Sequence, residues 1–256
     1  MASTVVVSAR PSERVALIAI NRPDRRNAID ADVRFGLIDA FAAALGDAAV
    51  RVVVVAGEGG TFCAGGDLSS LVGLDAKAAR ARLQSGHKLV KMLTATEKPI
   101  IAAVDGYAMG AGAGLALCAD TIVLGETATI GFPFLKVGLG PDFGVVYSLT
   151  RRVGLAKARN AVLYARNYRG RDALDLGLAD LVVPDATVRD KALELAAELA
   201  AMPTLALGIA KRQLAQFPAE LDAALELEAL GQPLCLTTAD FAEGVAAFKE
   251  KRRPSF

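Results

Sequence analysis

Two glycine-rich segments, each directly after a short run of aliphatic residues, most constrain how this chain can fold. The first is VVVVAGEGGTFCAGGDL at residues 52–68, and the second is IIAAVDGYAMGAGAGLAL at residues 100–117. An aliphatic run predicts a buried strand. Glycine after it predicts a tight corner, because glycine adopts positive φ and allows close approach to the main chain. This strand-to-corner unit occurs twice, with helical patterns around it, and so indicates an α/β fold.

Local patterns place further strands and helices over the first two thirds of the chain. A hairpin is expected from residues 4–8 and 15–20, around a turn at residues 11–13. Asp30 can cap a helix whose apolar positions share one face, and Gly46 supplies the stop signal of that helix. The same patterns predict strands at residues 51–56 and 99–104, and helices at residues 75–93 and 115–119.

The pattern changes to consecutive helices near residue 196. Helices are expected at residues 193–201, 205–216, 219–230 and 239–251, with a break at residues 217–218. We therefore divide the chain into a strand-and-helix core at residues 1–195 and a helical region at residues 196–256. These helices carry leucine and alanine on more than one face, so we expect them to dock onto the core or onto a neighbouring subunit.

Charge and rare residues exclude several classes of function. Lysine and arginine number 29 against 28 aspartates and glutamates, so no basic surface for nucleic acid is expected. The longest uncharged stretch, residues 106–119, is too short to cross a membrane, and residues 1–15 lack the apolar centre of a secretory signal. Three cysteines without C-x-x-C spacing and a single histidine favour a cytoplasmic protein without a structural metal.

The second glycine-rich segment continues into a helix, and such a junction can bind an anion. The unpaired N–H groups of a first helical turn point at whatever lies before it, so two converging corners would make a two-donor anion hole. Glycine could instead serve tight packing alone, and that alternative stays open. A dinucleotide-binding fingerprint fails at Leu115, and a phosphate loop would need a G-K-[ST] sequence that is absent.

The motifs taken together resemble one family. NRPDRRNAI (residues 21–29), FCAGGDL (62–68), KPIIAAVDGYAMGAGAGLAL (98–117) and ATIGFPFLKVGLGPDFGVVYSLTRRVG (128–154) occur in order, at the spacing of the enoyl-CoA hydratase/isomerase (crotonase) superfamily. ARNYRGRDALDLGLADLVVP (165–184) and EGVAAFKEKRRPSF (243–256) extend the resemblance to essentially the whole chain. The resemblance implies a crotonase-like spiral of ββα units with a C-terminal helical trimerisation region, in a homotrimer or a dimer of trimers.

The resemblance also implies an acyl-CoA enzyme that stabilises a thioester enolate. Two backbone N–H groups hold the enolate oxygen in the family, and by motif match they belong here to Gly66 and Ala111. Coenzyme A arrives as part of the substrate, so no separate cofactor is implied. The family's substrate and coenzyme A contacts fall on Arg26, Ala28, Ala64, Asp67, Leu68, Phe134, Phe248 and Lys251.

Some of these contacts have simpler alternatives. Arg26 and Lys251 could be solvated surface charges, and Asp67 is expected to shape its loop and not to perform chemistry. Phe248 and Lys251 would reach the nucleotide of coenzyme A from their own or a neighbouring subunit. A basic side chain beside a phosphate is physically reasonable there.

Two departures from the family pattern argue against hydration of an enoyl-CoA. Hydratases of the family use two glutamates, and their positions align here with Gly114 and Phe134. Without these carboxylates no pair of acids is available to add water across a double bond. We therefore expect hydratase activity to be weak or absent.

Asp142, in KVGLGPDFG, is the acid that remains at a position where the resemblance implies chemistry. It aligns with the base of some family isomerases and with the aspartate nucleophile of the family's aryl-CoA dehalogenases. An apolar setting made by Phe132, Phe134 and Phe143 would raise its pKa and suit proton transfer. The alternative is that Asp142 only caps the helix that begins near Phe143.

His87 and Cys63 are further candidates. His87 has the spacing of the general base of the dehalogenase branch, although that branch carries a tryptophan where this chain has Phe134. A surface or packing role is the alternative for His87. Cys63 has no partner base close in sequence, so packing is expected of it. No G-x-S-x-G sequence is present, which disfavours a serine hydrolase.

These observations favour an enoyl-CoA double-bond isomerase in which Asp142 moves a proton between C2 and C4. A one-base shift needs only one carboxylate. Two alternatives stay open. One is hydrolase, dehalogenase or lyase chemistry on an acyl- or aroyl-CoA, with Asp142 as nucleophile and His87 as base. The other is a homologue that binds acyl-CoA without turnover.

Overall fold

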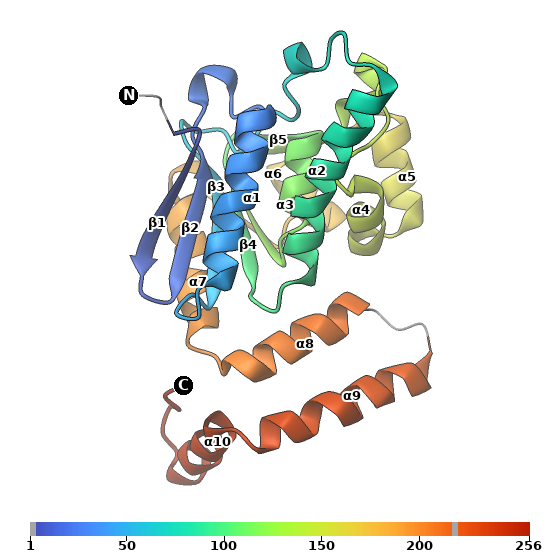
Figure 1. Ribbon diagram of the computed structural model, residues 1–256. Helices are drawn as coiled ribbons and strands as arrows, with labels where there is room; N and C mark the ends of the chain where they lie inside the picture. The colour runs from blue at the N-terminus through green and yellow to red at the C-terminus, as the bar shows by residue number, and fades with distance from the viewer. Residues whose placement is uncertain (1–3, 217–219) are drawn as a thin grey trace.

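The computed structural model describes residues 4–216 and 220–256, and a six-stranded sheet is its largest feature (Figure 1). The strand order is β1-β2-β3-β4-β6-β9. β1 pairs antiparallel with β2, and every other neighbouring pair in this sheet is parallel. The strands are β1 Val6–Ser12, β2 Val15–Ile20, β3 Val52–Gly57, β4 Ile100–Val104, β6 Thr121–Gly125 and β9 Leu181–Val183.

A second sheet of three strands makes the fold a repeat of ββα units. Its order is β5-β7-β8, with β5 at Tyr107–Met109, β7 at Thr129–Gly131 and β8 at Asn167–Arg169. Two successive stretches of chain each give one strand to the large sheet, one to the small sheet and then a helix. They are β4, β5 and α3 (Ala111–Leu117), followed by β6, β7 and α4 (Val145–Val153).

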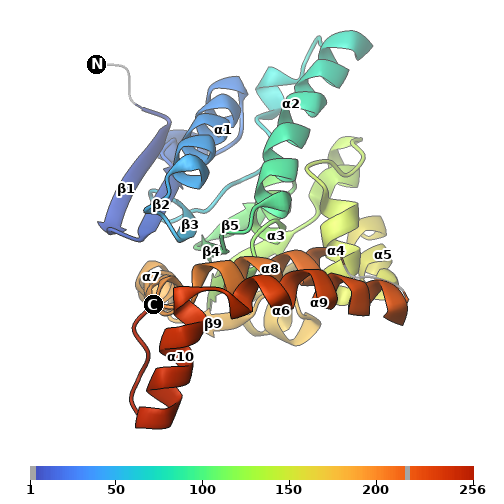
Figure 2. The same cartoon turned by 60° about the horizontal axis from the view of Figure 1, so that its bottom comes forward.

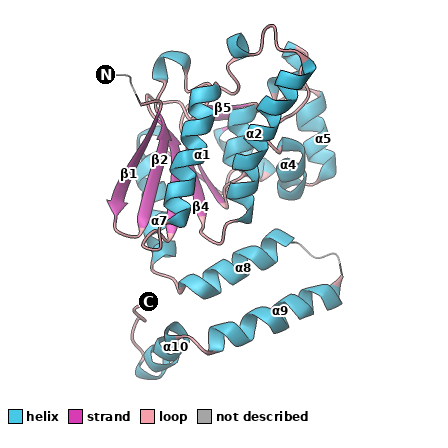
Figure 3. Ribbon diagram, viewed as in Figure 1, coloured by secondary structure: helices cyan, strands magenta, loops and turns pink. Residues whose placement is uncertain are grey.

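Helices cover both faces of the large sheet (Figure 3). α1 (Ala31–Gly46) and α2 (Ala76–Ala95) lie on one side, and α7 (Val188–Ala200) packs on the other. β2, β3 and β4 are therefore buried along their whole length, which is why their sequences are continuous aliphatic runs. The helices α5 (Leu155–Leu163) and α6 (Gly170–Leu176) complete the core.

The predicted start of α1 is confirmed, whereas the predicted bounds of α3 and β1 are wrong. Asp30 accepts a hydrogen bond from the N–H of Val33 at 2.9 Å and so caps α1. α3 begins at Ala111 and not at Leu115, because its glycines allow close packing that outweighs their low helical propensity. β1 continues through Pro11 to Ser12, since an edge strand tolerates proline.

The last three helices form an arm that lies below the core in Figure 1 and runs along one side of it in Figure 2. They are α8 (Thr204–Gln216), α9 (Leu221–Leu236) and α10 (Ala239–Glu250). The domain boundary that we placed after residue 195 falls inside α7, which stays packed on the sheet to its end. α9 runs past its predicted end at residue 230 and includes Pro233. The predicted break at residues 217–218 and the predicted helix start at residue 219 lie outside the described residues.

The arm leaves apolar side chains uncovered. Five leucines of α9 are exposed: Leu221, Leu225, Leu230, Leu234 and Leu236. Their docking onto a neighbouring subunit stays a prediction. No single helix in the described part of the chain is long and apolar enough to span a bilayer. Only α7 and α8, taken together across a bend of 111°, reach that length and composition.

The two glycine-rich corners are in direct contact. The main chain of Cys63 pairs with that of Ala108, and the N–H of Met109 donates to the carbonyl oxygen of Cys63 at 2.9 Å. A Cβ on Gly112 would lie 2.4 Å from that same oxygen. A Cβ on Gly65 would lie 2.8 Å from the carbonyl oxygen of Met109. Both distances are shorter than a methyl group tolerates, so the contact requires glycine on each side.

We predict that Gly112→Ala lowers the free energy of unfolding by about 1–3 kcal/mol, the usual cost of overpacking. The new methyl group would meet the backbone oxygen of Cys63, which cannot move without moving the loop that pairs with Ala108. Urea-induced unfolding followed by circular dichroism measures the change. Gly46→Ala is the control, because nothing lies within 4 Å of a Cβ at the end of α1. It should be neutral or slightly stabilising. Equal stability of Gly112→Ala and wild type would contradict the contact.

Candidate active site

The two N–H groups predicted to form an anion hole lie where the glycine-rich corners meet. Gly66 follows Gly65, whose φ is 104°, and Ala111 follows Gly110, whose φ is 53°. A Cβ on Gly65 would lie 3.8 Å from the nitrogen of Ala111, which places the two corners side by side. Neither the Gly66 nor the Ala111 N–H donates to an acceptor among the described residues. The pair is therefore free to bind an oxygen that carries negative charge.

Main-chain hydrogen bonds from the segment before α1 fix the Gly66 corner. The N–H of Ile29 donates to the carbonyl oxygen of Gly65 at 2.7 Å, and that of Asp67 donates to the carbonyl oxygen of Ile29 at 3.0 Å. This pattern uses the groups on either side of Gly66 and leaves its own N–H unpaired. Ala64, one of the predicted substrate contacts, is tied to the same segment by a bond from its N–H to the carbonyl oxygen of Arg26 at 3.0 Å.

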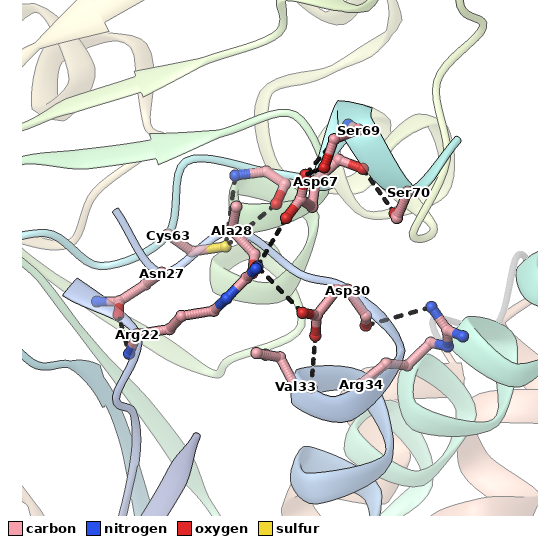
Figure 4. Close-up of polar contacts among 11 residues, drawn as sticks. Arg22, Asn27, Ala28, Asp30, Val33, Arg34, Cys63, Asp67, Ser69 and Ser70 are labelled. Atoms are coloured by element: carbon pink, nitrogen blue, oxygen red, sulfur yellow. Dashed lines mark hydrogen bonds and ion pairs between the residues drawn. The ribbon is translucent and has the colours of Figure 1, made fainter. Parts of the chain in front are cut away.

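Arg22, which our sequence analysis missed, joins the two segments electrostatically (Figure 4). Its Nη1 lies 2.8 Å from Asp67 Oδ2 and 3.1 Å from Asp30 Oδ2, and it also donates to the carbonyl oxygen of Ala28 at 3.2 Å. Hydrogen bonds from Ser69 and Arg22 hold the pKa of Asp67 below its usual value. Asp67 is thus a fixed, charged part of its loop, as expected. The only sequence signal for Arg22 was its place in the first motif.

A cavity of about 20 Å³, room for one water molecule, lies beside Ala111. It brings together Ala111, His87 and Asp142, which come from α3, α2 and the loop before α4. The remaining lining residues are Ile29, Arg34, Arg82, Leu83, Gly86 and Phe143. Asp142 is the only carboxylate among these lining residues.

Asp142 is buried at one oxygen and has an unusual electrostatic environment. Its Oδ1 is enclosed and accepts no hydrogen bond from any described residue. Burial raises the pKa of Asp142, while the positive charge of Arg82 and the interaction with His87 partly oppose that rise. The helix-cap alternative is wrong. α4 begins after Gly144 and has no side-chain cap.

The loop around Asp142 fills the position of the first missing glutamate. A Cβ on Gly114 would lie 2.7 Å from Phe143 Cβ and 2.9 Å from its carbonyl oxygen. Phe143 itself has a φ of 53°, a left-handed conformation that is unusual for a bulky residue. A glutamate at position 114 is therefore incompatible with this loop.

Only one of the three phenylalanines expected around Asp142 lines its cavity. That residue is Phe143, whereas Phe132 is fully buried elsewhere in the core. Phe134 packs over Gly110, with a ring carbon 3.6 Å from the position of a Cβ. Phe134 thus packs against the corner that carries Ala111, and it offers no carboxylate to the site.

Two arginines of the cavity were not anticipated from the sequence. Arg34 is buried on α1, and Arg82 is half-buried on α2, with its Nη2 3.1 Å from the position of a Cβ on Gly66. A signal for Arg34 existed, because it sits between the apolar core positions Val33 and Leu37. For Arg82 there was no such signal, because it lies on an amphipathic helix, where a charged side chain is expected to face solvent.

Cys63 has a packing role, in line with the prediction. It is fully buried, and its Sγ accepts a bond from the N–H of Gly65 at 3.4 Å. Burial raises the pKa of the Cys63 thiol to about 12, so the thiolate is not available as a nucleophile. Within residues 4–216 and 220–256, no three histidine, cysteine, aspartate or glutamate side chains are grouped to hold a metal ion.

The remaining predicted contacts lie outside the cavity. Arg26 and Leu68 are exposed on the two segments that flank Gly66, and Ala28 is half-buried beside them. Phe248 is 85% exposed, and Lys251 ends α10 on the arm. Figure 1 shows α10 at the opposite end of the molecule from β5 and α2. One chain alone does not bring Phe248 and Lys251 to the site.

Comparison with known proteins gives consistent matches over nearly the whole chain. A family profile described as enoyl-CoA hydratase/isomerase matches residues 10–256. The 2,3-dehydroadipyl-CoA hydratase of Escherichia coli is 36% identical over 99% of this chain and 98% of its own length. The 1,2-epoxyphenylacetyl-CoA isomerase of the same organism is 35% identical, with 94% of each chain covered.

Solved structures match equally well. An enoyl-CoA hydratase from Polaromonas is 31% identical and superposes with a TM-score of 0.92 over 98% of each chain. An enoyl-CoA hydratase from Bacillus anthracis is 28% identical and superposes with a TM-score of 0.94 over 98% of each chain.

We predict that Asp142→Asn is more stable than wild type at pH 7. The folded pKa of Asp142 lies above its ordinary value of 3.8, so the ionised carboxylate opposes folding at neutral pH. The advantage of the variant should shrink as the pH falls and vanish near the ordinary value, where wild-type Asp142 is protonated. Urea unfolding at a series of pH values measures it.

Asp67→Asn is the matched control and should behave in the opposite way. The folded pKa of Asp67 lies below its ordinary value, so its ionised form stabilises the fold at neutral pH. The variant should be less stable than wild type at pH 7, and the difference should narrow as Asp67 becomes protonated in acid. A loss of stability in Asp142→Asn at pH 7 would show that the buried carboxylate has a structural partner.

Proposed function

The chain belongs to the enoyl-CoA hydratase/isomerase family, with the crotonase-like fold that its motifs imply, and we propose that it is an enoyl-CoA double-bond isomerase. Its substrate would be an unsaturated acyl-CoA whose thioester carbonyl lies between the N–H groups of Gly66 and Ala111. One observation carries the proposal. The single carboxylate of the adjoining cavity, Asp142, has a buried oxygen that accepts no hydrogen bond from a described residue.

The anion hole would supply the electrostatic part of catalysis. Removal of a proton from the acyl chain places negative charge on the thioester oxygen, and the two N–H groups would stabilise that charge. Neither group donates to an acceptor among the described residues, so no hydrogen bond seen there has to break before the oxygen binds. Loss of one donor from such a pair typically lowers the rate by roughly 10²–10³-fold.

Asp142 would act as the one base. It would take a proton from C2 of a 3-enoyl thioester, leaving a dienolate, and return the proton to C4. The double bond then lies between C2 and C3, and Asp142 is regenerated as a carboxylate. Burial favours this role, because a raised pKa makes the Asp142 carboxylate a stronger base for the first proton transfer.

The missing glutamates favour isomerisation over hydration. Addition of water needs groups that hold and activate it. Position 114 is a glycine covered by Phe143, and position 134 is a phenylalanine. Relatives named as hydratases and a relative named as an isomerase are similarly close to this chain, so membership of the family does not choose between them.

A second candidate is hydrolytic chemistry on an acyl- or aroyl-CoA. His87 and Asp142 line the same cavity, and this proximity favours Asp142 as nucleophile with His87 as the base that activates water. A covalent aspartyl intermediate, labelled by substrate in a single turnover, would distinguish this reaction from isomerisation.

Substrate and assembly follow from the same proposal. Coenzyme A would be bound as part of the substrate, by the segments that carry Arg26, Ala28 and Leu68, and no other cofactor takes part. Phe248 and Lys251 are exposed on the arm, and in a homotrimer or a dimer of trimers they would reach the nucleotide held by a neighbouring subunit.

We predict that wild-type protein moves the double bond of a 3-enoyl-CoA and exchanges its C2 and C4 protons with D₂O. Asp142→Asn should lower both rates by roughly 10²–10⁴-fold, the usual contribution of a general base. Proton NMR of the thioester measures exchange and migration together. His87→Asn is the matched control, since the proposed isomerisation does not use the imidazole, and its rates should stay within about tenfold of wild type.

Two results would count against the isomerase. Acyl-CoA binding with no exchange in the wild type would support the homologue without turnover. Release of free coenzyme A that depends on both Asp142 and His87, without migration of the double bond, would support the hydrolytic candidate.

A further inference from the structure

Arg34, which lines the cavity, has a buried N–H donor without an acceptor among the described residues. Only 7% of its surface is exposed, and no other charged residue in the described part of the chain is buried to this degree. Its Nη1 donates to the carbonyl oxygen of Asp30 at 3.4 Å, a long contact, while its buried Nε has no acceptor among the described residues. A buried guanidinium group with an unpaired N–H is costly, so this N–H favours a bound acceptor in the cavity.

Arg82 brings a second guanidinium group to the same cavity from α2. Its Nη2 lies 3.1 Å from the position of a Cβ on Gly66, directly beside the anion hole. Across residues 4–216 and 220–256, no carboxylate lies within ion-pair distance of Arg82. Burial and the positive charge of Arg82 lower the pKa of Arg34, and the negative charge of Asp30 only partly opposes this.

The neighbouring carboxylates do not balance these charges. Asp30 caps α1 through Val33 and pairs with Arg22, and Figure 4 shows the Arg34 guanidinium on the other side of Asp30 from Arg22. Asp142 is the only carboxylate that lines the cavity, and its buried Oδ1 accepts no hydrogen bond from a described residue. Two arginines therefore face one carboxylate, and the cavity has more donors than acceptors.

We propose that Arg34 and Arg82 bind a carboxylate carried by the acyl group, so that the preferred substrate is the thioester of a dicarboxylic acid. This inference rests on the proposed function, because it takes the thioester oxygen to lie at Gly66 and Ala111 and the acyl chain to extend past Asp142. The planar fork of an arginine matches a carboxylate with two parallel hydrogen bonds. A hydroxyl or ether oxygen would satisfy the Nε donor but would leave the paired positive charges uncompensated.

The cavity must enlarge to admit such a group, because about 20 Å³ does not hold a carboxylate. Its inner wall is Arg34 and Phe143, which approach each other across Gly86. A Cβ on Gly86 would lie 3.5 Å from the Phe143 ring and 4.0 Å from Arg34 Cδ. Its outer wall includes Leu83 and His87, both exposed on α2. These two side chains can turn toward solvent without disturbing the buried core.

The test compares two 3-enoyl-CoA thioesters of equal length, one ending in a carboxylate and the other in a carboxamide. The wild type should prefer the carboxylate by roughly 10- to 100-fold in kcat/KM, the effect of hydrogen bonds to a charged group. Arg34→Gln and Arg82→Gln should each bring this ratio to within a few-fold of unity. Arg80→Gln, an exposed arginine on the same helix, should keep the wild-type ratio. This ratio does not depend on the fraction of the protein that is folded, so it can also be measured in a destabilised variant.

The outcomes separate this inference from the isomerase. Suppose that the wild type turns over a methyl-ended 3-enoyl-CoA, that this turnover depends on Asp142, and that the carboxylate thioester is not preferred. This result would overturn the carboxylate site and leave the isomerase proposal standing. An unchanged ratio in both arginine variants would overturn it as well. If no thioester is turned over, the isomerase fails. Dissociation constants from calorimetry then give the same carboxylate-to-carboxamide ratio, and a ratio near unity overturns the carboxylate site.

Discussion

The close approach of two glycine-rich corners is the constraint on which the rest of the site depends. β3 and β4 are parallel neighbours, so the segments that follow them leave the sheet at the same edge. Gly65 and Gly112 then let the corners touch, since a Cβ at either position would collide with a backbone oxygen. This contact holds Gly66 and Ala111 side by side with unpaired N–H groups. The proposed anion hole would therefore be a consequence of backbone packing, and no side chain would have to supply it.

The position of Asp142 also depends on a glycine, which has no side chain. Gly114, one turn into α3, leaves room for Phe143, and Phe143 in its left-handed conformation sets Asp142 against the cavity. A buried carboxylate without a partner opposes folding, and such costs are typical of sites kept for function. Arg82 and Arg34 line the same cavity with hydrogen-bond donors, and the Nε of Arg34 has no acceptor among the described residues. Together they support the proposal of a ligand that brings both a carbonyl oxygen and a negative charge.

Much of the fold was predictable from local chemistry. The aliphatic runs predicted β3 and β4, and Asp30 marked the start of α1. The sequence motifs also predicted the pair of N–H groups at Gly66 and Ala111. Other features depend on contacts between distant segments. The early start of α3 follows from packing of its glycines, and the meeting of His87 with Asp142 follows from how α2 crosses the core. Arg34 and Arg82 could not be paired from the sequence, because they lie on different helices and belong to none of the motifs.

The central claim is that the Gly66 and Ala111 N–H groups hold a thioester oxygen while Asp142 faces the acyl carbons. A crystal structure with a bound, non-reacting acyl-CoA tests this most directly. The account predicts the thioester oxygen within hydrogen-bond distance of both nitrogens, about 2.7–3.2 Å, with an Asp142 oxygen next to C2 or C4. A thioester bound with its oxygen away from these nitrogens, or with Asp142 turned away from the acyl chain, would contradict it.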